Sequence, residues 1–299
     1  MPRTIAVCSQ KGGVGKTTSA VNLASELALE NLRVLLIDLD PQANATGGFG
    51  IDKKRIEKSI YPVLIGESPL QSAILKTQIP HLDLVPSHVS LSGAEVEMIG
   101  LPNRETLLKK ILEPFRKEYD LILVDGPPSL GLLTVNALTA SDGVLIPLQC
   151  EYYALEGLSQ LLETVRMVQQ GLNPGLVIEG ILLTMADFRT KLTNDVISEA
   201  RKVFGSKVYD AVIPRSVRLS EAPSRGLPIA LYDPGSPGAE AYRQLAKTIK
   251  EKIDVGNART RERNSSADSG ERTVGSAGGH EAASAVYPPE SLPAQEAAG

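Results

Sequence analysis

The sequence predicts an α/β fold, doubly wound around a mostly parallel β-sheet that is flanked by helices. Apolar runs at 5–8, 33–40 and 121–125 lack polar alternation, as do parallel strands that are buried on both faces. Stretches of helical periodicity separate these runs, which indicates repeated βαβ units with right-handed crossovers. With 299 residues, 42% of them hydrophobic, the chain can bury a sizeable core.

The first strand, 5–8, passes through a glycine-rich loop into a helix that begins near Lys16. The second strand, 33–40, ends in two carboxylates before Pro41. Pro114 must kink or end one of the later helices. In chain order, those later elements are expected as helices at 59–64 and 69–75, a strand at 82–86, a helix at 104–119, a strand at 121–125, a helix at 132–139, a strand at 143–148, a helix at 155–168, a strand at 177–184, a helix at 193–204, a strand at 207–213 and a helix at 239–253.

The loop after the first strand has the composition of a phosphate-binding loop. Its glycines let backbone N–H groups turn inward around a phosphate, and the start of the following helix adds a positive dipole end. Lys16 would reach the β- and γ-phosphates and the Thr17 hydroxyl would ligate Mg²⁺, as in the Walker A pattern GxxxxGK[ST]. A glycine-rich turn with two solvated lysines is disfavoured by the strand before it and the helix after it. The sequence therefore predicts a P-loop nucleotide fold whose nucleotide-binding residues include Lys11, Gly12, Gly13, Val14, Gly15, Lys16, Thr17 and Thr18.

Carboxylates follow two of the predicted strands. Asp125 ends an apolar strand, and a hard cation held by Thr17 and phosphate oxygens needs a nearby carboxylate. Asp38 and Asp40 lie two apart, so their side chains leave the second strand on the same side. One of them can serve Mg²⁺ while the other orients the attacking water. The alternatives are a turn cap at Asp125 and a polar strand end before Pro41.

Composition narrows the class of protein. No run approaches the length of a membrane span and no basic segment precedes an apolar one at the N-terminus, so we expect a cytoplasmic protein. Cys8 and Cys150 are too few and too far apart for a disulfide framework, and we expect both to be small buried apolar residues. The net charge of −4 means that any nucleic-acid binding must come from a local basic patch.

The composition changes from about Val255. Arg, Glu, Ser, Gly, Ala and Pro dominate the last part of the chain, and apolar periodicity stops. We therefore expect one domain, 1–254, and a disordered polar tail, 255–299. The tail has no apolar face opposite Lys or Arg, so it is not expected to act as a membrane anchor.

Two features of the loop and of the second strand resemble one family. Gln10 replaces the first Walker glycine and Lys11 follows it, so KGGVGKT resembles the deviant Walker A loop of the ParA/MinD group of P-loop ATPases. The segment IDLDPQANAT resembles the ParA switch segment. The resemblance implies that Lys11 reaches across a dimer interface to the partner's nucleotide, and that Asp40 is the hydrolytic aspartate. Asp38 would then either be structural or lie beside the metal ion together with Thr17 and Asp125. The catalytic residues would be Lys11, Lys16 and Asp40.

A later segment extends the resemblance. IPRSVRLSEAPS, which starts at Ile213, is similar to the late motif of chromosomal ParA/Soj proteins, and residues 183–190 resemble the loop after the preceding strand. In that family these loops border the adenine and carry arginines that bind DNA. The resemblance implies that Met185, Pro214 and Arg215 lie near the base, and that Arg189 and Arg218 bind DNA.

The resemblance, from about residue 3 to 253, implies a DNA-segregation ATPase that uses ATP and Mg²⁺. Such a protein forms a homodimer with ATP, binds nonspecific double-stranded DNA, and is released by hydrolysis that a ParB-like centromere-binding protein stimulates. It would be cytoplasmic, nucleoid-associated and not bound to a membrane, with weak intrinsic activity. The alternatives are a MinD-like membrane-positioning ATPase, an iron–sulfur carrier of the nitrogenase type, for which the cysteines are poorly placed, and a non-enzymatic DNA-binding module, which gives the carboxylates no role.

Overall fold

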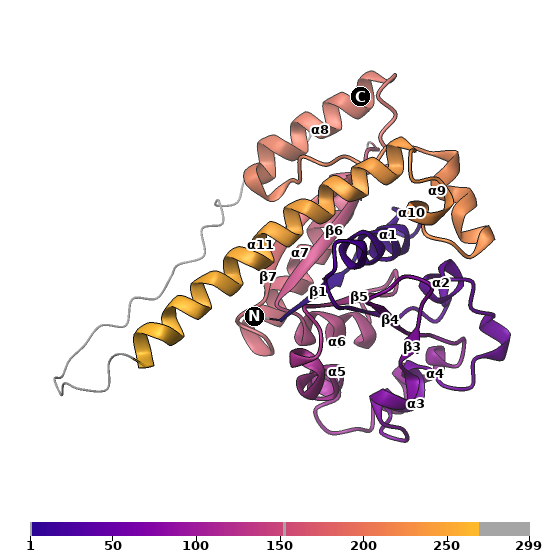
Figure 1. Cartoon of the computed structure of the whole chain (residues 1–299), viewed down its shortest axis with the longest axis vertical. Helices are drawn as coiled ribbons and strands as arrows, with labels where there is room; N and C mark the ends of the chain where they lie inside the picture. Colours follow the sequence, from indigo (N-terminus) through magenta and orange to yellow (C-terminus); the bar gives the residue numbers. More distant parts are fainter. Residues whose placement is uncertain (1, 152–153, 269–299) are drawn as a thin grey trace, which may run out of the picture. The chain divides into compact units, whose positions relative to one another are not determined.

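The computed structural model describes residues 2–151 and 154–268 (Figure 1). Its sheet has seven strands in the order β3-β4-β2-β5-β1-β6-β7, and every neighbouring pair is parallel except β3 and β4. The strands are β1 (Arg3–Val7), β2 (Val34–Asp38), β3 (Leu75–Lys76), β4 (Leu82–Val85), β5 (Leu121–Asp125), β6 (Gly143–Gln149) and β7 (Val177–Thr184). The predicted doubly wound, mostly parallel sheet is confirmed.

Helices cover both faces of the sheet (Figure 1). One buried cluster joins one face to α3 through α8, and a second joins the other face to α1, α10 and α11. Strands enclosed on both faces have no polar side to show, which explains their unalternated sequences. The helices are α1 (Lys16–Leu29), α2 (Asn44–Gly48), α3 (Ile60–Leu64), α4 (Leu91–Met98), α5 (Leu107–Leu112), α6 (Leu132–Ala140), α7 (Ala154–Gly171), α8 (Lys191–Phe204), α9 (Val217–Glu221), α10 (Ile229–Tyr232) and α11 (Pro237–Asp268).

Several boundaries differ from the sequence prediction. The predicted helix at 104–119 consists of a 3₁₀ turn, α5 and a second 3₁₀ segment that contains Pro114, so the proline ends the α-helix as expected. The predicted helix at 69–75 shortens to a 3₁₀ turn, Leu70–Ala73, before the antiparallel edge strand β3. Helix α4 lies in a stretch for which we predict no helix or strand.

The predicted strand at 207–213 is wrong. The segment follows the edge of β7, where the Tyr209 and Ile213 N–H groups donate to carbonyls of β7, but only the isolated bridge at Val208 pairs it with that strand. The ring of Tyr209 fills the space that a side chain at Gly180 would need, since a Cβ there would lie 2.3 Å from the ring. We attribute the interrupted pairing to this ring, which crosses the edge strand.

Helix α11 extends well beyond the predicted domain boundary. Its backbone is helical to Asp268, although we predict a disordered tail from Val255 onward, and 269–299 lie outside the described residues. We predict disorder there because apolar periodicity stops, but a segment can be helical without an apolar face. Adding a residue to an existing helix costs much less free energy than nucleating a new one. This stretch also contains Ala, Arg and Glu and no proline.

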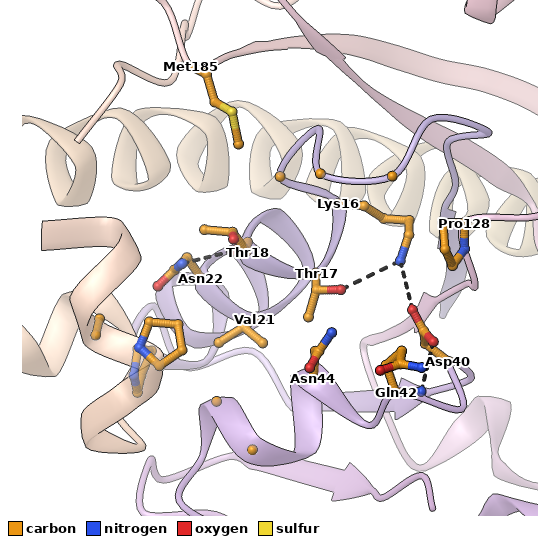
Figure 2. Close-up of a pocket in the computed structure, with 18 of the residues that line it drawn as sticks. Lys16, Thr17, Thr18, Val21, Asn22, Asp40, Gln42, Asn44, Pro128 and Met185 are labelled. Carbon is orange, nitrogen blue, oxygen red and sulfur yellow. Dashed lines mark hydrogen bonds and ion pairs between the residues drawn. The ribbon is translucent and has the colours of Figure 1, made fainter. Parts of the chain in front are cut away.

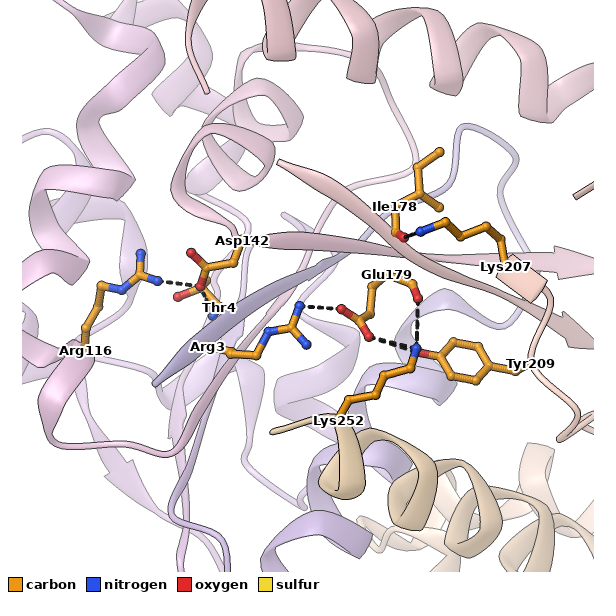
Figure 3. A network of polar contacts seen from close by, with 9 residues as sticks. All are labelled: Arg3, Thr4, Arg116, Asp142, Ile178, Glu179, Lys207, Tyr209 and Lys252. Carbon is orange, nitrogen blue, oxygen red and sulfur yellow. Dashed lines mark hydrogen bonds and ion pairs between the residues drawn. The ribbon is translucent and has the colours of Figure 1, made fainter. Parts of the chain in front are cut away.

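A polar network joins the amino end of β1 and the first part of the edge strand β7 to α11 (Figure 3). The buried carboxylate of Glu179 accepts hydrogen bonds from Arg3 at 2.5 Å and from Lys252 at 3.1 Å, and the Tyr209 hydroxyl donates to it. Because a buried charge needs partners, these contacts fix β1, β7 and α11 to one another. The network lies at the opposite end of the strands from the phosphate loop.

Among the described residues, no helix combines the length and the apolarity that a bilayer crossing needs.

Candidate nucleotide-binding site

The glycine loop between β1 and α1 lies at the carboxyl ends of the parallel strands, beside a cavity of about 480 Å³ (Figure 2). Gly13 and Gly15 have φ of 77° and 82°, in the left-handed region that glycine adopts at little cost. The loop can therefore turn into the N-terminus of α1, where unpaired N–H groups and the helix dipole favour an anion. Of the predicted loop residues, Lys11, Gly12, Gly13, Gly15, Lys16, Thr17 and Thr18 line this cavity, whereas Val14 is buried behind it.

Lys16 is the buried cation of the site. Its Nζ lies 3.2 Å from Asp125 Oδ1. It also lies 3.5 Å from the Thr17 hydroxyl and 3.7 Å from Asp40 Oδ2 (Figure 2). Burial alone would lower the pKa of Lys16, but the charges of Asp125 and Asp40 outweigh it, so the pKa is raised. Lys16 is therefore a permanent positive charge inside the cavity.

Asp125 has a free oxygen that suits a metal ion. Strand register sets Asp125 beside Val7 of β1 and Asp38 of β2, which brings its carboxylate to the loop. Its Oδ2 is buried and has no hydrogen-bond partner among the described residues. Burial raises the pKa of Asp125, and the charge of Lys16 opposes this. An orphaned carboxylate oxygen near the Thr17 hydroxyl fits the oxygen ligands that Mg²⁺ prefers.

Protein groups alone do not form a metal cage here. Within the described chain, no three His, Cys, Asp or Glu side chains gather in a way that could hold a metal ion.

Asp38, the last residue of β2, and Asp40, two residues beyond it, lie in different surroundings. Asp38 is fully buried, and its Oδ2 accepts hydrogen bonds from the Thr46 N–H at 2.8 Å and the Thr46 hydroxyl at 2.7 Å. Burial, reinforced by the charge of Asp125, raises the pKa of Asp38 to about 7. Asp40 instead lines the cavity, and its Oδ1 accepts from the Gln42 N–H at 2.9 Å. Of the two carboxylates, Asp40 faces the space where a nucleotide would lie.

The turn after Asp40 contains a strained residue and a lysine that the sequence analysis missed. Ala43 has a φ of 52°, a left-handed conformation that costs an alanine about 1–2 kcal/mol. Lys53 spans this residue, because its Nζ donates to Gln42 O and to Asn44 Oδ1, both at 2.8 Å. Lys53 also lines the cavity. No motif includes it, since it lies thirteen residues beyond Asp40 at the start of a short 3₁₀ helix, Lys53–Arg55.

Lys11 lies at the rim of the cavity. Its Nζ forms an ion pair with Glu151 at 3.1 Å, and both side chains are about half exposed. Lys16 lies buried between two carboxylates, whereas Lys11 faces outward. The two lysines of the loop thus have different environments.

The apolar end of the cavity is only partly as expected. Met185 lines it, but Pro214 and Arg215 do not, although the Arg215 N–H pairs with Ala186 O next to Met185. The base-side role expected for Pro214 and Arg215 thus has no support from the cavity lining. The lining residues there that the analysis missed are Val21, Asn22, Ala222, Pro223, Leu227 and Pro228. Pro223 belongs to the IPRSVRLSEAPS segment, so the resemblance of that segment could have indicated its place beside the cavity.

The expected DNA-binding arginines are exposed but paired. Arg189 donates two hydrogen bonds to Asp187, and Arg218 forms ion pairs with Glu221 and Asp233. On α11, Arg243 pairs with Glu26 and Glu240, and Lys250 with Glu30. These two cations of α11 therefore hold the helix to α1 instead of forming an unpaired basic surface.

Both cysteines are buried free thiols, as expected. Burial raises the pKa of Cys8 to about 12 and that of Cys150 to about 11.

Comparison with known proteins agrees with this site. Residues 2–178 match the AAA domain family. The chain is 57% identical over 249 residues to the sporulation initiation inhibitor protein Soj of Bacillus subtilis, covering 83% of this chain and 98% of that protein. It is 52% identical to the chromosome partitioning protein ParA of Myxococcus xanthus, over 83% of this chain and 87% of that protein.

A solved structure of cobyrinic acid a,c-diamide synthase from Mycobacterium smegmatis with bound ADP and magnesium has a TM-score of 0.76 and 36% identity, over 86% of this chain and 97% of that one. Fold and site thus define a P-loop ATPase. Within that class, the identity to Soj and ParA assigns the family: the chain belongs to the ParA/Soj family of chromosome-partitioning ATPases.

Proposed function

We propose that this protein is an ATP-driven DNA-partitioning ATPase that dimerises on ATP, binds nonspecific double-stranded DNA, and leaves the DNA when a ParB-like partner stimulates its slow hydrolysis. The observation that carries the proposal is the pair of lysines in one phosphate loop. Lys16 is buried against Asp125 and Asp40, whereas the side chain of the outward-facing Lys11 pairs, among the described residues, with the exposed Glu151. A second lysine at the rim can neutralise the phosphates of a nucleotide in another subunit.

Within one subunit, each side chain has a separable task. Lys16 offsets the charge of the β- and γ-phosphates, and Thr17 and Asp125 would hold Mg²⁺, which supplies further neutralisation of the phosphate charge. Asp40 lines the cavity and would orient the attacking water. Asp38, whose Oδ2 is occupied by Thr46, would be structural and not a metal ligand.

Dimerisation would turn hydrolysis into a change of assembly state. If Lys11 contacts the partner's phosphates, the ATP-bound dimer is favoured over the monomer, and loss of the γ-phosphate removes that preference. A dimer doubles the number of basic contacts with DNA, whose affinity depends on the number of phosphates contacted. The protein would then act on the nucleoid in the cytoplasm.

Sizing by light scattering, with and without ATP, tests the proposal through two opposite variants. Lys11→Ala should bind ATP but remain a monomer, because the cross-subunit cation is gone. Glu151→Gln should dimerise at roughly twofold to thirtyfold lower protein concentration, because two exposed ion pairs of about 0.2–1 kcal/mol each, one in each subunit, no longer hold Lys11 within its own subunit. A normal dimer in Lys11→Ala would refute the cross-subunit role.

A pelleting assay in the presence of ATP distinguishes the proposed function from that of a membrane-positioning ATPase. The proposal predicts sedimentation with double-stranded DNA and none with anionic liposomes, whereas a MinD-like membrane-positioning ATPase would show the reverse.

A further inference from the structure

Lys53 reaches the segment that carries Asp40 from outside the phosphate loop. Its Nζ bridges Gln42 O and Asn44 Oδ1 at 2.8 Å each, so it bonds to the residues on both sides of Ala43. Its stem lies against Gly47, where a Cβ would be 2.7 Å from Cε. A glycine at 47 therefore leaves room for this lysine.

The bridged turn fixes Asp40 from both its backbone and its side chain. The Ala43 N–H donates to Asp40 O at 2.8 Å, and the Gln42 N–H donates to Asp40 Oδ1 at 2.9 Å. The peptide between Gln42 and Ala43 links these bonds to Lys53, because its carbonyl accepts from Lys53 while its N–H donates to Asp40 O. Ala43, the last residue of this turn, is buried and held at a φ of 52°. An alanine left to itself would relax from this left-handed conformation, so the turn needs an external restraint.

We propose that Lys53 is a positioning residue for hydrolysis: by bridging Gln42 and Asn44 it holds the strained turn at Ala43, and thereby holds the Asp40 carboxylate toward the attacking water. The inference rests on the proposed role of Asp40. A charged donor suits the position because both acceptors are oxygens and hydrogen bonds from an ammonium are stronger than neutral ones. Lys53 acts through the turn and not on the nucleotide.

A direct contact between Lys53 and a phosphate is the competing explanation, because Lys53 also lines the cavity. The two explanations differ in what they change. A phosphate contact contributes to ATP binding, whereas a restraint on Asp40 contributes to the transition state and leaves ground-state binding nearly unchanged.

The test compares Lys53→Met in two backgrounds, the natural chain and Ala43→Gly. Methionine keeps the stem against Gly47 and removes the donors. In the natural background we expect the single-turnover hydrolysis rate to fall about tenfold, with ATP affinity changed less than twofold. In the Ala43→Gly background the left-handed turn is free of strain, so the same substitution should cost less than threefold.

The controls separate failure of this inference from failure of the proposed function. Lys54→Met, at an exposed neighbour that does not line the cavity, should hydrolyse ATP as the natural chain does. Asp40→Ala should bind ATP without hydrolysing it, and if it hydrolyses normally the role of Asp40 itself is wrong. If Asp40→Ala behaves as expected, an unchanged rate in Lys53→Met, a clear loss of ATP affinity, or an equal loss in both backgrounds would overturn the role of Lys53 alone.

Discussion

At the scale of single residues, the buried carboxylate of Asp38 makes stability depend on pH. Its pKa of about 7 lies above the unfolded value near 3.9, so folding favours the protonated form. This contribution is complete below about pH 4 and is lost as the pH rises through about 7. Between pH 6 and 8 the loss amounts to about 1.4 kcal/mol, or roughly 3–5 °C in thermal midpoint.

The measurement is thermal unfolding without nucleotide or metal, at pH 6 and pH 8. The natural chain should lose this increment, and Asp38→Asn, which cannot titrate, should lose less even if it is less stable throughout. An equal loss in both proteins would place the titrating group elsewhere.

The residues of the site differ in how far the sequence could predict them. Lys16, Thr17 and Asp125 belong to short contiguous patterns whose spacing follows from phosphate and metal chemistry. Lys53 and Leu227 reach the cavity only through tertiary folding, from segments without periodicity or motif. Pro214 and Arg215 are predicted by resemblance alone, and neither lines the cavity, although Pro214 pairs with Ala186 next to Met185.

At the scale of elements, buried parallel strands were predictable because their sequences are continuously apolar. The segment 207–213 is apolar too, but its pairing depends on Tyr209 crossing at Gly180, a contact between residues distant in sequence. Helix α11 shows the converse, since its final part is helical without an apolar pattern. Apolar periodicity in a sequence therefore indicates which segments are buried, and not whether the backbone forms a helix or a strand.

Helix α11 also gives a prediction about truncation. Its last described core side chain is Ile253, which is 2% exposed. A chain that ends after Val255 should keep its thermal midpoint, ATP hydrolysis and ATP-dependent dimerisation. The matched control ends after Ala246 and removes Ile249 and Ile253 from the core, which should lower the midpoint by roughly 10 °C or more. Calorimetry on both chains checks this, and a large drop for the longer one would give the tail a structural role.

At the scale of the whole molecule, a net charge of −4 must be reconciled with a polyanionic partner. Arg189 and Arg218 are exposed, but nearby carboxylates neutralise them, so a DNA phosphate would have to replace Asp187 or Glu221. Affinity for DNA should therefore be modest for one subunit and should depend strongly on salt and on dimerisation.

Arg189→Ala with Arg218→Ala should weaken DNA binding equally across sequences. The salt dependence should flatten by about one unit for each lost phosphate contact, while ATP-dependent dimerisation is unaffected. Binding measured over a range of salt concentrations on two unrelated duplexes checks this. Arg55→Ala is the control, since Arg55 is as exposed as Arg189 and also pairs with an aspartate. Normal binding by the double variant would move the DNA surface elsewhere.

The two buried thiols decide how the nucleotide site responds to electrophiles and oxidants. The pKa values of Cys8 and Cys150 are raised to about 12 and about 11. At pH 7 the fraction of each thiol that is deprotonated is therefore on the order of 10⁻⁵ to 10⁻⁴, and the thiolate is the reactive form. Hydrogen peroxide and maleimides should therefore leave both thiols of the folded chain largely unmodified. A single cysteine introduced on the surface could then be labelled selectively with a fluorophore, without first replacing either native thiol.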